Sequence, residues 1–393
     1  MADLPRASAG GTVIVDEAPV QQPPSIPHAG KRHIPALDGV RGLAAIAVFF
    51  FHYGDLSHSS WGLLRFANEV KLRGAYGVDI FFALSGFLIT GILWDMRNAN
   101  HRWLNFYRNR ALRLFPLYYG LWVFLAFYCI VFHHPWYRSN FAYLLYGGNF
   151  VYPFGALNQI GLFGVSHLWS LACEEQFYMI WPVLVWRIGK IETLKRIAMI
   201  AFFASLALKM LALGLHIDAR WSYVMLPLRM EGLCAGAYCA LALRTHPEET
   251  VRVGRRLFWI LCPAMVAFFM TSALLPLNYK VEHLFAFALV GSVGAALIAI
   301  AIDPESFSSR FFSTRVLRIA GKYSYGIYVY SVFLHTTLKT YLLPRVVRTF
   351  HGGITADVVY LVMVMCLVML LCLASFHLLE QPFLKLKRHR SPA

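Results

Sequence analysis

Charged residues are scarce in this sequence. Of its 393 residues only 14% are Asp, Glu, Lys or Arg, whereas 58% are hydrophobic and 16% are aromatic. Soluble domains carry nearer a quarter charged residues, so the composition excludes an ordinary soluble protein. We expect an all-α polytopic membrane protein, and the chain is long enough for about ten spans.

The sequence also lacks cysteines at metal-binding spacing. It has seven cysteines but no Cys-x-x-Cys motif, and most of the seven lie within apolar runs. We therefore expect neither a metal site nor a disulfide framework. Cys173 is the one cysteine in a polar setting that would suit an accessible thiol.

Acidic residues are too few to balance the basic ones, and the formal net charge is +16. Such an excess can indicate nucleic-acid binding, but here the basic residues are scattered between apolar segments, so we expect no nucleic-acid partner. The more basic loops, at 97–113, 187–196, 244–256 and 310–322, alternate with less basic ones. The positive-inside rule assigns these loops to the cytoplasm, in a multi-pass protein of the inner or plasma membrane.

The N-terminus shows no signal-peptide pattern. Residues 1–33 are rich in Ala, Pro, Gly and Gln, and no basic segment precedes an apolar one. We expect a disordered cytoplasmic tail over 1–33, one transmembrane domain over 34–384 and a basic cytoplasmic tail over 385–393.

Ten apolar windows of about 17–22 residues are long enough to cross a bilayer as helices. They lie near residues 36–54, 77–95, 113–132, 167–187, 197–215, 224–243, 257–275, 284–302, 319–338 and 357–377. An even number of spans leaves both termini on the cytoplasmic side.

The first window carries an arginine at one end and a histidine at the other. At about 100° per residue, Arg41 and His52 share a helical face, and Asp38 and Asp55 lie within a turn of it. Arg41 and His52 would lie roughly 16 Å apart along the axis. Ionisable groups within a membrane helix are functional candidates, although Arg41 at one surface and His52 at the other would also be tolerated.

A second basic group precedes the third window. Arg110 and Arg113 are neighbours on one helical face, in the segment Phe106-Tyr107-Arg108-Asn109-Arg110-Ala111-Leu112-Arg113. Guanidinium groups suit phosphate oxygens, such as those of a nucleotide-bearing donor like coenzyme A. The alternative is that this cluster only sets the topology.

Acidic residues mark the start of the fourth window. His167, Ser170 and Glu174 align on one helical face, and Glu175 and Tyr178 pair on the adjoining one. Packing alone does not explain two carboxylates at the mouth of a membrane helix, although a helix N-terminus does favour acidic residues. We therefore expect a functional role for these residues.

Three further charges lie inside apolar windows. Asp79 shares a face with Gly86, for which we expect a role in close helix packing. Arg229 and Glu231 are about 200° apart on a helix, so we expect that they do not pair with each other.

Taken together, these segments resemble the membrane-bound acyltransferase family 3, the O-antigen O-acetylase-like proteins. The matching pieces, in order from about residue 35 to 384, are LDGVRGLAAIAVFFFH, GVDIFFALSGFLIT, FYRNRALRLFPLYY, SHLWSLACEEQFYMIWP, LRMEGLCAGA and GKYSYGIYV. One departure is that many members carry a histidine where this chain has Ser331, and His335 follows one turn later.

The resemblance implies an O-acyltransferase that moves an acyl group, usually acetyl, from cytoplasmic acyl-CoA to a hydroxyl of a glycan or lipid-linked sugar. It implies functional roles for Arg41, His52, the Arg110/Arg113 pair and the acidic motif that begins at Glu174. Acetyl-CoA would be a co-substrate, and no bound cofactor is implied. The acceptor, the acyl length and the oligomeric state stay open.

An acyl-CoA thioester is already activated, so the protein has to position two substrates and remove one proton. His52 is the candidate general base, since the pKa of an ordinary histidine lies near neutrality. Asp55 or a glutamate of the Glu174/Glu175 pair would orient it, and Arg41 would hold coenzyme A or stabilise the thioester oxygen.

Two alternatives stay open. A covalent route would pass through acyl-His52 or acyl-Cys173. A protein of another class, a transporter or flippase of a glycan or lipid, would use the same intramembrane charges, including Asp79, Arg229 and Glu231, for translocation.

Overall fold

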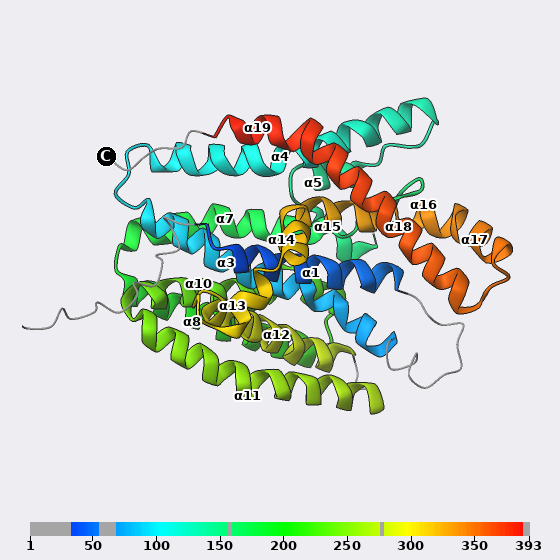
Figure 1. Cartoon of the computed structure of the whole chain (residues 1–393). Helices are drawn as coiled ribbons and strands as arrows, with labels where there is room; N and C mark the ends of the chain where they lie inside the picture. The colour runs from blue at the N-terminus through cyan, green and yellow to red at the C-terminus, as the bar shows by residue number, and fades with distance from the viewer. Residues whose placement is uncertain (1–32, 55–67, 156–158, 276–278, 388–393) are drawn as a thin grey trace, which may run out of the picture.

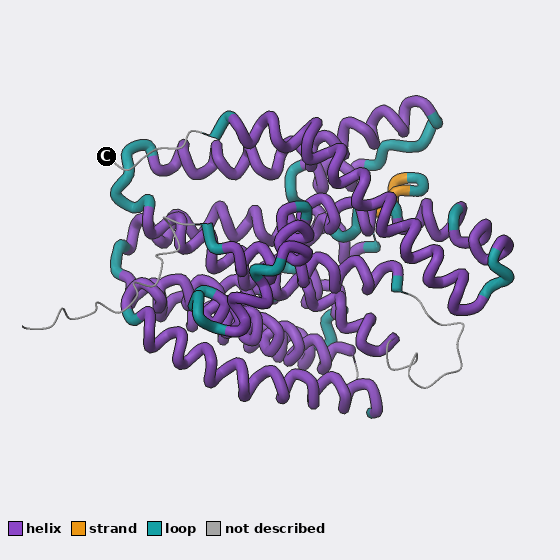
Figure 2. The backbone as a smooth tube through the Cα atoms, viewed as in Figure 1, coloured by secondary structure: helices purple, strands orange, loops and turns teal. Residues whose placement is uncertain are grey.

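The computed structural model describes residues 33–54, 68–155, 159–275 and 279–387. Asp55 and most of the two expected tails, 1–33 and 385–393, lie outside the described residues. The described segments are almost wholly helical, as the apolar windows predict, with one small strand pair (Figure 2).

The first half of the chain contains α1 (Pro35–Tyr53), η1 (Arg73–Tyr76), α3 (Gly77–Asp95), α4 (Arg102–Val131), α5 (Arg138–Leu144), α6 (Gly148–Val151) and η2 (Tyr152–Phe154). An antiparallel pair, β1 (Gln159–Ile160) and β2 (Phe163–Gly164), then leads into α7 (Leu168–Ile188). The second half contains α8 (Ile191–Gly214), α9 (Ala219–Val224), η3 (Leu226–Leu228), α10 (Met230–Thr245), α11 (Pro247–Leu274) and α12 (Tyr279–Ala301). It ends with α13 (Phe307–Phe312), α14 (Arg315–Lys322), α15 (Ser324–Phe333), α16 (His335–Tyr341), α17 (Leu343–Thr349), α18 (Gly353–Ser375), the π-helical turn η4 (Phe376–Glu380) and α19 (Gln381–Lys385).

Seven helices of the described segments are long and apolar enough to cross a membrane. They are Pro35–Tyr53, Asn68–Asp95, Arg102–Val131, Ile191–Gly214, Pro247–Leu274, Tyr279–Ala301 and Gly353–Lys385. Three predicted windows are not among them. α7 carries Glu174, Glu175 and Arg187, α10 has only 16 residues, and the window near 319–338 is divided among α14, α15 and α16.

Burial divides these helices into a centre and a periphery. The apolar part of α12 is 83% buried and that of the Asn68–Asp95 helix 61%, whereas α11 is only 6% buried. α3 contacts α1, α7, α10 and α12, so it lies at the centre of the bundle. Figure 1 shows α11 along one edge and α4 with α19 along the opposite edge. The peripheral helices expose apolar side chains, as a lipid-facing surface requires.

Glycine allows the central helices to pack closely. A Cβ atom on Gly86 would lie 1.9 Å from the carbonyl oxygen of Leu233, and one on Gly236 would lie 1.9 Å from that of Ala83. Contact at this distance is possible only without a side chain, so α3 and α10 meet backbone to backbone. The packing role expected for Gly86 is confirmed.

Candidate active site

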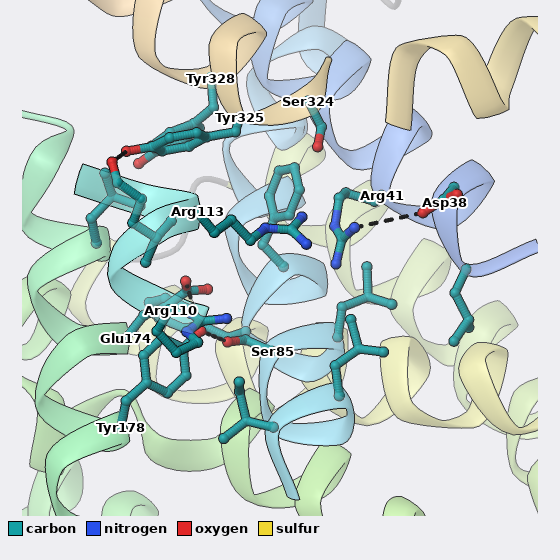
Figure 3. A pocket seen from close by; sticks show the side chains of 18 of the residues that line it. Asp38, Arg41, Ser85, Arg110, Arg113, Glu174, Tyr178, Ser324, Tyr325 and Tyr328 are labelled. Atoms are coloured by element: carbon teal, nitrogen blue, oxygen red, sulfur yellow. Dashed lines mark hydrogen bonds and ion pairs between the residues drawn. The ribbon is translucent and has the colours of Figure 1, made fainter. Parts of the chain in front are cut away.

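A pocket of about 310 Å³ lies between α1, α3, α4, α7 and α15. Figure 3 shows most of the polar residues of this pocket. The polar lining consists of His33, Asp38, Arg41, Ser85, Arg110, Arg113, Ser170, Glu174, Tyr178, Ser324, Tyr325 and Tyr328. The rest of the lining is apolar and comes mainly from α3, including Phe81, Phe82, Leu88 and Ile89. Six of the predicted site residues, from the three helices α1, α4 and α7, therefore meet in one cavity.

Three arginines from two helices point into this pocket. Nη1 of Arg41 lies 3.6 Å from Oδ1 of Asp38, and Nη2 of Arg110 lies 3.9 Å from Oε1 of Glu175. The Arg110 guanidinium also stacks 3.9 Å from the centre of the Tyr178 ring. Arg113 forms no ion pair within the described segments. Like charges held together in this way favour an anionic ligand, and guanidinium forks match phosphate oxygens.

A fourth cation lies close to this arginine group. Lys387 follows α19, beyond the last candidate span, and α19 packs against α4. Burial and, to a smaller extent, the nearby Arg113 and Arg110 guanidinium groups together lower the pKa of the Lys387 amine to about 8. An anion bound between these cations would favour the charged amine and raise that pKa.

Hydroxyl groups link α7, which bears Glu174, to α3 and to α15. The Tyr178 hydroxyl donates to Oε2 of Glu174 at 3.1 Å and also hydrogen-bonds to the Ser85 hydroxyl. At the other end of the pocket the hydroxyls of Ser170 and Tyr328 lie 2.5 Å apart. Sequence reasoning missed Ser85 as a site residue, because its only signal was its place in the second family motif.

His52 lies outside the lining of this pocket, near the opposite end of α1 from Arg41. Its ring centre is 5.7 Å from that of His335, the histidine that follows Ser331 by one turn. The Tyr53 hydroxyl donates to the carbonyl oxygen of Ser331 at 2.7 Å, which ties the end of α1 to α15. Glu174 lines the pocket with Arg41, whereas the ring of His52 contacts the rings of Phe51 and His335.

His167 is also buried behind the pocket. Its side chain is 6% exposed, and its ring centre lies 5.3 Å from that of Tyr328. The backbone carbonyl of His167 accepts a hydrogen bond from the Tyr328 hydroxyl at 2.8 Å. Of the predicted face of His167, Ser170 and Glu174, the last two line the pocket.

The remaining predicted charges form a separate buried network. Nη2 of Arg229 donates to Oδ1 of Asp79 at 3.0 Å, and Lys209 pairs with Glu231. Arg229 and Glu231 thus have different partners, as their angular separation predicts. The Arg229 guanidinium also lies 3.4 Å from the centre of the Phe287 ring. Lys209 was missed, because a single lysine within an apolar helix gives no sign of its partner.

Cys173 is not accessible, contrary to the sequence prediction. It is fully buried, and its thiol donates to the carbonyl oxygen of Val224 at 2.9 Å. The polar neighbours that suggested exposure, Glu174 and Glu175, are on other faces of α7. Across the described ranges, no group of three or more His, Cys, Asp or Glu residues is arranged to hold a metal ion.

Comparison with known proteins gives a consistent family. The profile of the acyltransferase domain of acyltransferase family 3 matches residues 34–377. Peptidoglycan O-acetyltransferase OatA of Listeria monocytogenes is 32% identical over 327 residues, which cover 76% of this chain and 49% of that protein. O-acetyltransferase OatA of Staphylococcus aureus is 26% identical over 374 residues, which cover 90% of this chain and 58% of that protein.

The chain therefore spans about half the length of the curated relatives that it matches. No solved structure matches it.

Proposed function

Because this chain belongs to acyltransferase family 3, we propose that it is an integral membrane O-acetyltransferase. It would move an acetyl group from cytoplasmic acetyl-CoA to a hydroxyl of a cell-envelope glycan, and cross the plasma membrane about ten times with both termini inside. The observation that carries the proposal is the convergence of Arg41, Arg110 and Arg113 with Glu174 in one pocket.

The arginine group supports a phosphorylated donor. Arg113 forms no ion pair within 4 Å among the residues described, and Arg110 is held in place by Glu175 and by the Tyr178 ring. Coenzyme A carries several phosphate oxygens, each able to accept charge-assisted hydrogen bonds from a guanidinium. The apolar wall from α3 would then lie against the less polar arm of the donor.

The histidines at the other end of α1 support proton removal from the acceptor. His52 would take the proton of the acceptor hydroxyl as that oxygen attacks the thioester carbonyl, and the coenzyme A thiolate would leave and be protonated. His335, whose ring meets that of His52 edge-on with the ring centres 5.7 Å apart, would orient it in place of the glutamates considered from the sequence. Donor and acceptor would thus approach from opposite sides of the membrane.

The glycan class follows from the relatives. The Listeria protein is named for peptidoglycan, so a peptidoglycan-like amino sugar is the first acceptor to test. The matched region covers 49% of that protein, so the activity in its name is a proposal for this chain.

Transfer of labelled acetyl groups tests the proposal directly. Purified protein in proteoliposomes should hydrolyse [¹⁴C]acetyl-CoA or transfer its acetyl group to a soluble muropeptide. Arg113→Ala should raise the KM for acetyl-CoA about 10- to 150-fold, which corresponds to roughly 1.5–3 kcal/mol for a hydrogen bond to a charged group. Arg113→Lys should restore the KM only in part, because a lysine ammonium group cannot form the two parallel hydrogen bonds that a guanidinium donates to a phosphate.

Arg138→Ala is the matched control, since Arg138 is exposed at the start of α5 and lies outside the pocket. Its KM should be unchanged. An unaltered KM in Arg113→Ala would reduce the arginine group to a topology signal, and an absence of any acetyl transfer or hydrolysis would contradict the proposed activity.

A further inference from the structure

Two short helices, α13 and α14, expose an unusual amount of apolar surface for their length. Phe307 is 81% exposed and Val316 is 74% exposed, and Phe311 and Ile319 are 46% and 42% exposed. Neither helix is long enough to cross a membrane. Exposed apolar side chains of this size indicate contact with an apolar environment, and a short helix that lies along the membrane surface can reach the lipid for such contact.

The same segment carries an exposed row of cations. Residues 306–322 include Arg310, Arg315, Arg318 and Lys322 but no acidic residue. The last three share one face of α14 at i, i+3 and i+7, next to the face of Val316 and Ile319. Within the described ranges no carboxylate pairs with any of the four.

The third face of α14 is fixed against α1. A Cβ atom on Gly42 would lie 2.2 Å from the carbonyl oxygen of Leu317, and one on Gly321 would lie 1.9 Å from that of Asp38. Figure 1 shows α14 crossing α1. Asp38 and Arg41, which line the pocket, belong to the same part of α1. A displacement of α14 would therefore also displace these two residues.

We propose that α13 and α14 form a binding surface for anionic phospholipid headgroups, and that lipid bound there sets the position of Asp38 and Arg41. A helix with one basic and one apolar exposed face lies at the headgroup boundary, with its apolar side chains buried about 5–10 Å deep. Each cation near an anionic leaflet contributes about 1 kcal/mol. The lipid-binding part is independent of the enzymatic proposal, and only the regulatory part depends on it.

Site-specific quenching tests lipid binding without an activity measurement. A bimane label is placed on Val316→Cys, in a protein with Cys262→Ser and Cys366→Ser, because these two native cysteines are the ones not buried among the described residues. In nanodiscs, brominated phosphatidylglycerol should quench the label at a far lower mole fraction than brominated phosphatidylcholine. Arg315→Gln/Arg318→Gln should weaken this preference about thirtyfold, as about 1 kcal/mol for each cation predicts.

Two variants serve as controls. Arg315→Lys/Arg318→Lys should keep the preference, because it retains both charges. Arg345→Gln/Arg348→Gln removes two exposed cations elsewhere and should also keep it. Equal quenching by the two lipids, or loss of the preference in the Arg345/Arg348 control, would overturn the proposed surface.

The regulatory part has its own readout. The KM for acetyl-CoA should rise at least threefold when phosphatidylglycerol is replaced by phosphatidylcholine, and Arg315→Gln/Arg318→Gln should show no such lipid dependence. An active enzyme whose KM ignores the lipid would overturn the coupling and leave the headgroup surface intact.

Discussion

At the scale of single residues, the contact between His52 and His335 bears on the family histidine that this chain replaces with Ser331. Ser331 occupies the position where many members carry a histidine. The Tyr53 hydroxyl donates to the backbone carbonyl oxygen of Ser331, so this hydrogen bond does not require the serine side chain. One helical turn later, His335 brings an imidazole to His52. A second imidazole thus lies beside His52, but it comes from a position four residues after Ser331.

We expect His52→Ala to retain less than about a tenth of wild-type kcat, because a general base typically contributes about 10²–10⁴-fold. Membrane insertion should be unaffected, since the substitution removes a polar group. Acetyl transfer in proteoliposomes measures the effect, and His377→Ala, at an exposed histidine of η4, serves as the control. Turnover above a tenth in His52→Ala would exclude His52 as the base.

The sequence could predict pocket residues where charges lay in or beside apolar windows, where polar residues shared a helical face, or where a family motif pointed to them. Arg41, Arg110, Arg113 and Glu174 were identified in that way, and they do meet. The neighbours that hold them, such as the Ser85 hydroxyl on Tyr178, depend on contacts between distant helices. No periodicity in one segment reveals a partner in another.

At the scale of helices, the buried pair of Asp79 and Arg229 joins α3 to α10, next to the pocket wall. Arg229 lies 5.6 Å from the centre of the Phe82 ring, and Phe82 lines the pocket. Removal of one partner leaves an uncompensated charge in a low-dielectric interior, which is far more costly than removal of both.

We therefore expect Arg229→Met to lower the free energy of unfolding by roughly 3–5 kcal/mol. Asp79→Leu/Arg229→Met should be clearly more stable than either single variant. Thermal unfolding in detergent gives the comparison, and a double variant as unstable as the sum of the two single ones would show that the pair is not coupled.

Helix boundaries were predicted less well than helix existence. α4 begins at Arg102, well before the apolar window near 113–132, because its first turns are polar and hydropathy detects only the lipid-buried part. The window near 319–338 is interrupted after Lys322 and after Phe333. Its apolar residues on α15 pack against α1 and α18 instead of against lipid, so composition alone suggested one continuous span.

At the scale of the whole molecule, the described segments contain seven candidate spans, and the sidedness of the chain in the membrane can be measured by labelling. The positive-inside rule assigns the loop before α4 to the cytoplasm. In outer-permeabilised cells, Ser139→Cys should react with an impermeant maleimide, whereas Asn100→Cys should react only after lysis. Both positions lie near the ends of α4 or in the adjoining α5, so they report on one helix. Labelling of Asn100→Cys in unlysed cells would reverse the proposed topology and the direction of donor entry.

The ion pair between Asp79 and Arg229 also has a consequence for how the protein is made. The two residues are 150 positions apart, so at about 5–20 residues per second Asp79 leaves the ribosome roughly 8–30 s before its partner. During that interval the Asp79 carboxylate is without its ion-pair partner Arg229. The contact that joins α3 to α10 can therefore form only after the chain has been synthesised as far as Arg229.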